Sequence, residues 1–226
     1  MDWIQDYQLF LFDFDGLLVD TEPLHYASYA QLCLQHGCEM KWDFERFCQE
    51  AHGKAMGIWE ALMREFPHLF EGESSREVLY EEKKTLYVEL LQKRPLEFME
   101  GAADLLAALD KRGAKRAVVT NSPRAHIEII KESLPLLKSI PLWITREDYS
   151  HPKPSPEGYL KAIEHLAGPG DKIIGFEDTL KGLKALLSAD VESILICPSQ
   201  KTHVKECVML GAKHFESLLS INRLLA

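Results

Sequence analysis

At residues 9–13, and again from residue 96 onward, short apolar segments alternate with amphipathic stretches, and this pattern limits the possible folds more than any other feature. The apolar segments are short and rich in β-branched residues, which is typical of strands buried on both faces of a sheet. The amphipathic stretches place apolar residues at helical spacing. Together they predict an α/β fold with a parallel sheet covered by helices. The predicted strands are 9–13, 115–121, 141–145, 171–178 and 191–198, and the predicted helices are 102–112, 123–132, 156–167, 180–188 and 202–210.

Residues 21–95 have a different pattern, with helical spacing throughout and no segment that resembles a buried strand. Trp42, Trp59 and Phe47 are large enough to form a small core within this region. We therefore expect two domains: residues 1–20 with 96–226 form the α/β core, and residues 21–95 form an α-helical domain inserted after the first strand.

The chain has 26 Lys and Arg against 35 Asp and Glu, a formal net charge of −9, which disfavours nucleic acid and anionic membranes as partners. An anionic substrate would need local positive groups or a metal. No apolar run approaches the roughly 20 residues of a membrane span, and the first residues lack a secretory pattern. The 5 cysteines include no CxxC pair, which favours reduced thiols and a cytoplasmic location. A monomer is compatible with all of these features.

Chemically reactive side chains follow the predicted strands at their carboxyl ends, where open parallel sheets bind their ligands. We expect these side chains to meet at one edge of the sheet. Each also has a purely structural interpretation, for example as a turn residue or a surface lysine. In particular, Ser122 before Pro123 fits a helix N-cap, and Asp178 or Thr179 can cap the next helix. The candidates are Asp13, Asp15 and Gly16, then Thr120, Asn121 and Ser122, then Lys153, and finally Glu177 and Asp178.

The chemistry of these candidates is that of phosphoryl transfer. Carboxylate oxygens suit Mg²⁺, and one carboxylate, Asp13, can attack phosphorus to form an aspartyl phosphate. Asp15, two residues later, can protonate the leaving oxygen and then deprotonate the attacking water. The Thr120 hydroxyl and the N-terminal amides of the 123–132 helix can hold phosphoryl oxygens. Lys153 can balance the charge on the nucleophile and the phosphoryl group.

Four segments resemble the motifs of the haloacid dehalogenase superfamily: DFDGLLVDTEPLH, VVTNS, KPSPEGYLKA and IGFEDTLKGLKA. The resemblance is to the phosphatase and sugar-phosphate mutase branch, and it covers nearly the whole chain. It implies a Rossmann-like core, an inserted helical cap and a Mg²⁺ cofactor. The implied roles are Asp13 as nucleophile, Asp15 as general acid/base, Thr120 as phosphate ligand, Lys153 as orienting group, and Asp13, Asp15 (through its backbone carbonyl), Glu177 and Asp178 as metal ligands.

Other residues bear on which reaction of this superfamily the chain performs. The dehalogenating members lack the second aspartate, so Asp15 indicates phosphoryl transfer. His25 resembles the cap-hinge histidine of the β-phosphoglucomutases. Those enzymes hold a second phosphate with a cap arginine, whereas Met56 stands at the matching position here. Lys54 and Arg124 are further candidate phosphate contacts, beside Gly16, Asn121 and Ser122.

We therefore expect hydrolysis of a small phosphorylated metabolite, a phosphomonoester. Two alternatives stay open: a sugar-phosphate mutase of the β-phosphoglucomutase type, and a non-catalytic protein that binds such a metabolite. The cap loop at 51–57 is expected to select the substrate, and its residue types do not reveal the shape of the pocket.

Overall fold

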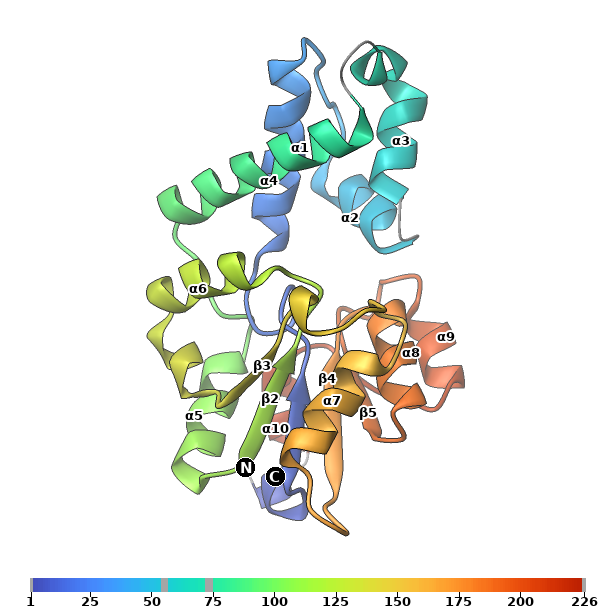
Figure 1. The fold of residues 1–226 in the computed structure, drawn as a ribbon. Coiled ribbons are helices and arrows are strands. Elements are labelled where there is room, and N and C mark those ends of the chain that lie inside the picture. The colour runs from blue at the N-terminus through green and yellow to red at the C-terminus, as the bar shows by residue number, and fades with distance from the viewer. Residues whose placement is uncertain (1, 54–56, 72–74, 225–226) are drawn as a thin grey trace. The chain divides into compact units, whose positions relative to one another are not determined.

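The computed structural model describes residues 2–53, 57–71 and 75–224. By its internal contacts the chain divides into two compact units, residues 1–20 with 96–226 and residues 21–95 (Figure 1). In the described residues, the first unit contains every strand, and the second contains only helices and the turns between them.

Among the described residues, six parallel strands form one sheet, which confirms the predicted α/β fold. They are β1 Leu9–Phe12, β2 Lys115–Val119, β3 Leu142–Ile144, β4 Ile173–Glu177, β5 Glu192–Ile196 and β6 Lys213–Phe215, arranged in the order β3-β2-β1-β4-β5-β6. β1 is central, and Leu9 lies opposite both Lys115 of β2 and Ile173 of β4. The strand order thus reverses between β1 and β4, the kind of position at which parallel sheets bind ligands.

Helices connect these strands and cover the sheet, with α7 in front of it and α10 behind it in Figure 1. Successive side chains of β1 point to opposite faces of the sheet. Leu9 and Leu11 pack in one buried cluster with Tyr159 of α7, while the Phe10 ring contacts Trp3 with centroids 6.2 Å apart. The helices are α5 Ala102–Arg112, α6 Arg124–Ser133, α7 Glu157–Leu166, α8 Leu180–Ser188, α9 Val204–Met209 and α10 Leu218–Leu224, with 3₁₀ turns at Asp2–Asp6, Pro135–Ser139 and Arg146–Asp148.

The second unit has a core of its own. Trp42, Phe47 and Trp59 are all buried in it. Its longest helix, α4, begins where the Ser75 hydroxyl accepts a hydrogen bond from the Val78 amide (3.4 Å), a standard N-cap contact. The helices are α1 Glu22–Gln35, α2 Phe44–Gly53, α3 Gly57–Glu65 and α4 Arg76–Lys93, with a 3₁₀ turn at Pro67–Phe70.

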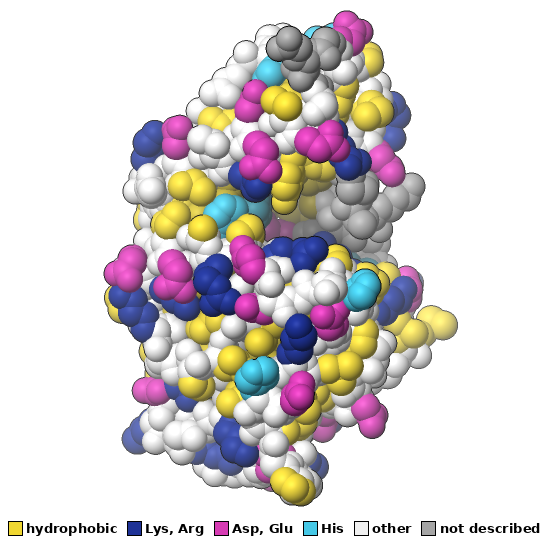
Figure 2. Space-filling model, in the orientation of Figure 1, with side chains coloured by type: hydrophobic (Ala, Val, Ile, Leu, Met, Phe, Trp, Pro, Cys, Tyr) yellow, Lys and Arg dark blue, Asp and Glu magenta, His cyan; other side chains and the backbone are white. Residues whose placement is uncertain are grey.

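The surface carries charges of both signs. On the face drawn in Figure 2, Lys and Arg side chains lie among Asp and Glu side chains rather than in a patch of one sign. Within the described residues, no helix combines the length and the apolar character that crossing a bilayer requires.

Candidate active site

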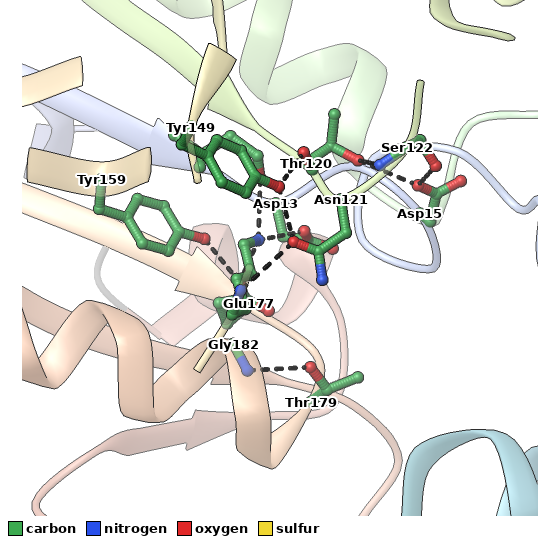
Figure 3. Close-up of polar contacts among 12 residues, drawn as sticks. Asp13, Asp15, Thr120, Asn121, Ser122, Tyr149, Tyr159, Glu177, Thr179 and Gly182 are labelled. Atoms are coloured by element: carbon green, nitrogen blue, oxygen red, sulfur yellow. Dashed lines mark hydrogen bonds and ion pairs between the residues drawn. The ribbon is translucent and has the colours of Figure 1, made fainter. Parts of the chain in front are cut away.

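With the exception of Arg124, the predicted residues of the first unit lie near the carboxyl ends of β1, β2 and β4 (Figure 3). Backbone hydrogen bonds extend the sheet to the first residue after two of these strands. The Asp13 amide donates to the carbonyl of Phe176 (3.0 Å), and the Thr120 amide donates to the carbonyl of Ile144 (3.0 Å). Both side chains are therefore placed by the sheet itself rather than by a flexible loop.

Lys153 is the charged centre of the site. Its ammonium group donates to the Asp13 carboxylate, to Glu177 Oε1 (2.5 Å) and to the carbonyl of Val119 (2.8 Å). The side chain is 5% exposed, which excludes its interpretation as a solvated surface lysine. One buried cation thus joins the ends of β1, β2 and β4.

Burial and the neighbouring charges determine the pKa values of Asp13 and Lys153. Burial raises the pKa of Asp13 to about 7, and the Glu177 charge adds to the rise, while Lys153 opposes it. For Lys153, burial lowers the pKa, but the nearby Asp13 and Glu177 outweigh this and hold the pKa above its usual value. The lysine is therefore charged at neutral pH, and the carboxylates around it crowd one another.

Three buried carboxylates could hold a metal ion. Asp13, Glu177 and Asp178 each offer an oxygen, and these oxygens lie within 4.8 Å of one another. Glu177 Oε2 is buried and has no hydrogen-bond partner among the described residues. Three carboxylates against one lysine leave an excess of negative charge, and hard oxygen donors suit Mg²⁺. The residues present thus fit the expected cofactor, although the Asp15 carboxylate is not part of this group of three.

Asp15 lies beside the residues that follow β2. Its Oδ2 accepts hydrogen bonds from the Ser122 hydroxyl (2.6 Å) and the Thr120 hydroxyl (3.2 Å). The N-cap interpretation of Ser122 is therefore wrong: Pro123 occupies the N-cap of α6, and the Ser122 hydroxyl reaches across the chain to Asp15. Gly16 forms the turn after Asp15 with φ +77°, and its amide donates to the carbonyl of Val19 (2.9 Å).

Arg124 lies in a different setting from the predicted phosphate contact. One nitrogen of its guanidinium, Nη2, donates to both oxygens of Asp148 (2.7 Å to each), and its backbone amide donates to Glu147 (3.0 Å). The first amide of α6, which was expected to face a phosphoryl oxygen, is therefore engaged by a carboxylate. The role of Arg124 in phosphate binding stays a prediction.

The two predicted cap residues belong to the second unit. The His25 ring stacks on Tyr87 with centroids 4.1 Å apart, and its Nδ1 is 2.8 Å from the Lys83 ammonium. Lys54 and Met56 lie outside the described residues. Their proposed roles stay predictions as well.

Two tyrosines at the site have no counterpart among the predicted residues. The Tyr159 hydroxyl donates to Glu177 Oε1 (2.6 Å), and the Tyr149 hydroxyl lies 2.7 Å from both the Thr120 carbonyl and Asn121 Oδ1. Burial raises the pKa of Tyr149 to about 12 and that of Tyr159 well above its usual value. Both therefore keep their protons at neutral pH. No sequence signal indicates these contacts, since an aromatic residue in an apolar pattern is usually core.

Gly182 leaves room for the Glu177 carboxylate. A Cβ added at this position would lie 2.0 Å from Glu177 Oε2, and α8 is fixed there because the Thr179 hydroxyl caps it through the Gly182 amide (3.3 Å). We expect Gly182→Ala to displace Glu177 and to lower the free energy of unfolding by about 1–3 kcal/mol, the usual effect of overpacking. Urea denaturation measures this loss.

Gly168→Ala is the matched control for this substitution. A Cβ there would lie no closer than 3.6 Å to Asp171, which is an ordinary contact. Equal stability of the two alanine variants would contradict the close approach of Gly182 to Glu177.

Comparisons with known proteins agree with this geometry. The acidic residues lie at the carboxyl ends of the central strands, where α/β proteins with open parallel sheets bind their ligands. A family model described as haloacid dehalogenase-like hydrolase matches residues 7–190. The chain therefore belongs to the haloacid dehalogenase-like hydrolases and is an enzyme, as the four motifs predicted.

Two named proteins and one solved structure are similar to this chain over most of its length. A phosphorylated carbohydrates phosphatase of Thermotoga maritima is 30% identical over 192 residues, which cover 81% of this chain and 82% of the relative. A validoxylamine A 7'-phosphate phosphatase of Streptomyces hygroscopicus subsp. limoneus is 29% identical over 185 residues, covering 82% and 83%. The crystal structure of CbbY from Rhodobacter sphaeroides in complex with phosphate has a TM-score of 0.76 at 22% identity, covering 95% of this chain and 96% of that one. This last likeness confirms the Rossmann-like fold.

Proposed function

We propose that the protein hydrolyses a small phosphorylated carbohydrate in a Mg²⁺-dependent reaction that passes through an aspartyl phosphate on Asp13. The observation that carries this proposal is the buried lysine that donates to both Asp13 and Glu177 beside a third carboxylate, Asp178. Such an excess of buried negative charge is costly unless a cation completes the site. The two phosphatases named above, which act on phosphorylated carbohydrates and on validoxylamine A 7'-phosphate, support the choice of substrate class.

Asp13 is the nucleophile in the proposed mechanism. Lys153 binds one carboxylate oxygen, Oδ1, and so turns the other toward the phosphorus. A bond forms between that oxygen and phosphorus while the bond to the leaving ester oxygen breaks. Thr120 and Asn121 orient the phosphoryl oxygens, and the Thr120 hydroxyl then exchanges its contact with Asp15 for one with the phosphoryl group.

Asp15 moves the proton in both steps. In its acid form it donates a proton to the departing oxygen, which leaves as an alcohol. Its carboxylate then takes a proton from water, the water oxygen bonds to phosphorus, and the bond between phosphorus and Asp13 breaks. The products are inorganic phosphate and the original Asp13 carboxylate.

Asp13, Glu177 and Asp178 would hold the metal through side-chain oxygens, and Asp15 would hold it through its backbone carbonyl. A bound Mg²⁺ supplies charge stabilisation for the phosphoryl oxygens.

The proposal also includes the second unit and the location of the protein. Residues 21–95 act as a cap that selects the metabolite, with His25 and Lys54 as candidate contacts. All five cysteines are buried and none forms a disulfide, which supports a reducing compartment such as the cytoplasm.

Hydrolysis is favoured over mutase activity by the residue at position 56. The β-phosphoglucomutases hold a second phosphate with a cap arginine, and this sequence has Met56 at the matching position. A substrate with one phosphate does not need that arginine.

The test is an assay of phosphate release from a panel of hexose, pentose and polyol phosphates, with Mg²⁺ and with EDTA. We expect release from at least one ester, reduced by about 100-fold or more in EDTA because the charge stabilisation is worth several kcal/mol. Lys184→Gln, which alters only an exposed ion pair with Glu206, should leave the rate unchanged. Release from no ester would contradict the proposal. Isomerisation of a hexose 1-phosphate with a bisphosphate primer, without net phosphate release, would favour the mutase.

A further inference from the structure

We infer that Tyr149 and Tyr159 are positioning residues that serve the two halves of the site separately: Tyr149 orders the phosphate loop, residues 120–122, and Tyr159 orients the metal ligand Glu177. This inference rests on the proposed function. The two hydroxyls point into different parts of the site (Figure 3), and each contacts residues that the other does not.

Tyr159 determines which oxygen of Glu177 is offered to a cation. The Tyr159 hydroxyl and the Lys153 ammonium both donate to Oε1, at 2.6 and 2.5 Å. Oε2 is the oxygen that has no hydrogen-bond partner among the described residues. A carboxylate fixed in this way presents Oε2 in one orientation. Removing a hydrogen-bond partner of a metal ligand typically weakens metal affinity by about 10- to 100-fold.

Tyr149 acts on the phosphate loop. Its hydroxyl lies 2.7 Å from two acceptors, the Thr120 carbonyl and Asn121 Oδ1, and it can donate its one proton to either of them. The Lys153 backbone amide donates to the same Oδ1 (3.4 Å). With Oδ1 turned toward these donors, the Asn121 amide nitrogen points away from Tyr149 (Figure 3). It can then donate to a phosphoryl oxygen.

The packing of these rings does not require the hydroxyl groups. Both tyrosines belong to a buried apolar cluster that includes Leu9 and Val119. Phenylalanine preserves the ring and its apolar contacts, and Glu177 and Asn121 each keep a contact with Lys153. Tyr149→Phe and Tyr159→Phe therefore remove one oxygen each and serve as matched controls for one another.

The experiment measures two dissociation constants for each full-length variant without turnover: Mn²⁺ in the absence of phosphate, and inorganic phosphate at saturating Mg²⁺. We expect Tyr159→Phe to weaken Mn²⁺ binding by about 10-fold or more and to leave the phosphate Kd within about threefold. We expect Tyr149→Phe to weaken phosphate binding by about 5- to 10-fold and to leave the Mn²⁺ Kd unchanged. Thermal unfolding verifies that both variants are folded.

A double variant tests the route through Asn121. If Tyr149 acts by orienting Asn121, then Tyr149→Phe and Asn121→Ala together weaken phosphate binding by less than the product of their separate effects. Independent, fully multiplicative effects would overturn this part of the inference.

The outcomes separate this inference from the proposed function. A wild-type protein that binds neither Mn²⁺ nor phosphate would contradict the proposed function itself. If the wild type binds both ligands, a tyrosine variant that loses affinity for both equally, or for neither, would overturn the positioning role of that tyrosine. Both roles are supported only if Tyr159→Phe weakens Mn²⁺ binding alone and Tyr149→Phe weakens phosphate binding alone.

Discussion

The Asp13→Asn variant is expected to release phosphate at least about 10³-fold more slowly than the wild type from every ester tested, because an amide cannot replace the attacking carboxylate. Asparagine has nearly the same shape, and Lys153 keeps its contacts with Glu177 and with the carbonyl of Val119. The variant should therefore fold, and its loss should be in kcat. A steady-state assay with purified protein, combined with thermal unfolding, measures both quantities.

Two companion variants sharpen this test. Asp15→Asn should lose more activity on alkyl phosphates than on p-nitrophenyl phosphate, because an aryl leaving group needs little help from an acid. Asp171→Asn alters a carboxylate that pairs with Lys115 at the start of the strands, away from the site, and should keep its activity. Asp13→Asn with wild-type activity would exclude Asp13 as the nucleophile.

Lys153→Met is expected to reduce the free energy of unfolding by about 3–5 kcal/mol in the absence of divalent metal, since it leaves buried carboxylates without their cation. Asp13 and Glu177 both lose a hydrogen bond to the ammonium group. Added Mg²⁺ should restore part of the loss by supplying positive charge to the same carboxylates. Urea denaturation with Mg²⁺ and with EDTA measures both effects.

The matched control removes a lysine from the surface. Lys184 forms an exposed ion pair with Glu206 (2.9 Å), and Lys184→Met should cost less than about 1 kcal/mol with no response to Mg²⁺. If Lys153→Met were no less stable than this control, Lys153 would not be the charge that balances the buried carboxylates.

The parallel sheet was predictable because its central strands are apolar and lie between clear helical patterns. The predicted helices at 102–112 and 180–188 match α5 and α8. β6, Lys213–Phe215, was missed, since two of its three residues are Lys and His and it contains no apolar run. The order of the strands was not predicted, because a pairing between distant residues, such as Leu9 with Ile173, is not visible in the local sequence pattern.

The site was predictable to the extent that its residues lie in motifs at the strand ends. Asp13 and Glu177 carry charges at the ends of apolar strands and Lys153 lies in the loop before α7; burial of such charges is costly unless they are paired. The interactions of Ser122 and Tyr149 were not predictable, because each depends on a hydroxyl that meets a residue distant in sequence. For Ser122, the local preference for capping a helix gave way to a tertiary contact with Asp15.

The central place of β1 has a consequence for how the chain is made. Of the six described strands β1 is synthesised before the others, yet Leu9 pairs with Lys115 on one side and with Ile173 on the other, so neither neighbour exists until more than a hundred further residues have been added. Contacts of such long sequence separation form slowly. During that interval a strand of four large apolar residues, Leu9–Phe12, has both edges open. Nascent chains that stop before β4 should therefore depend on chaperones, whereas residues 21–95 have all the contacts of their own core.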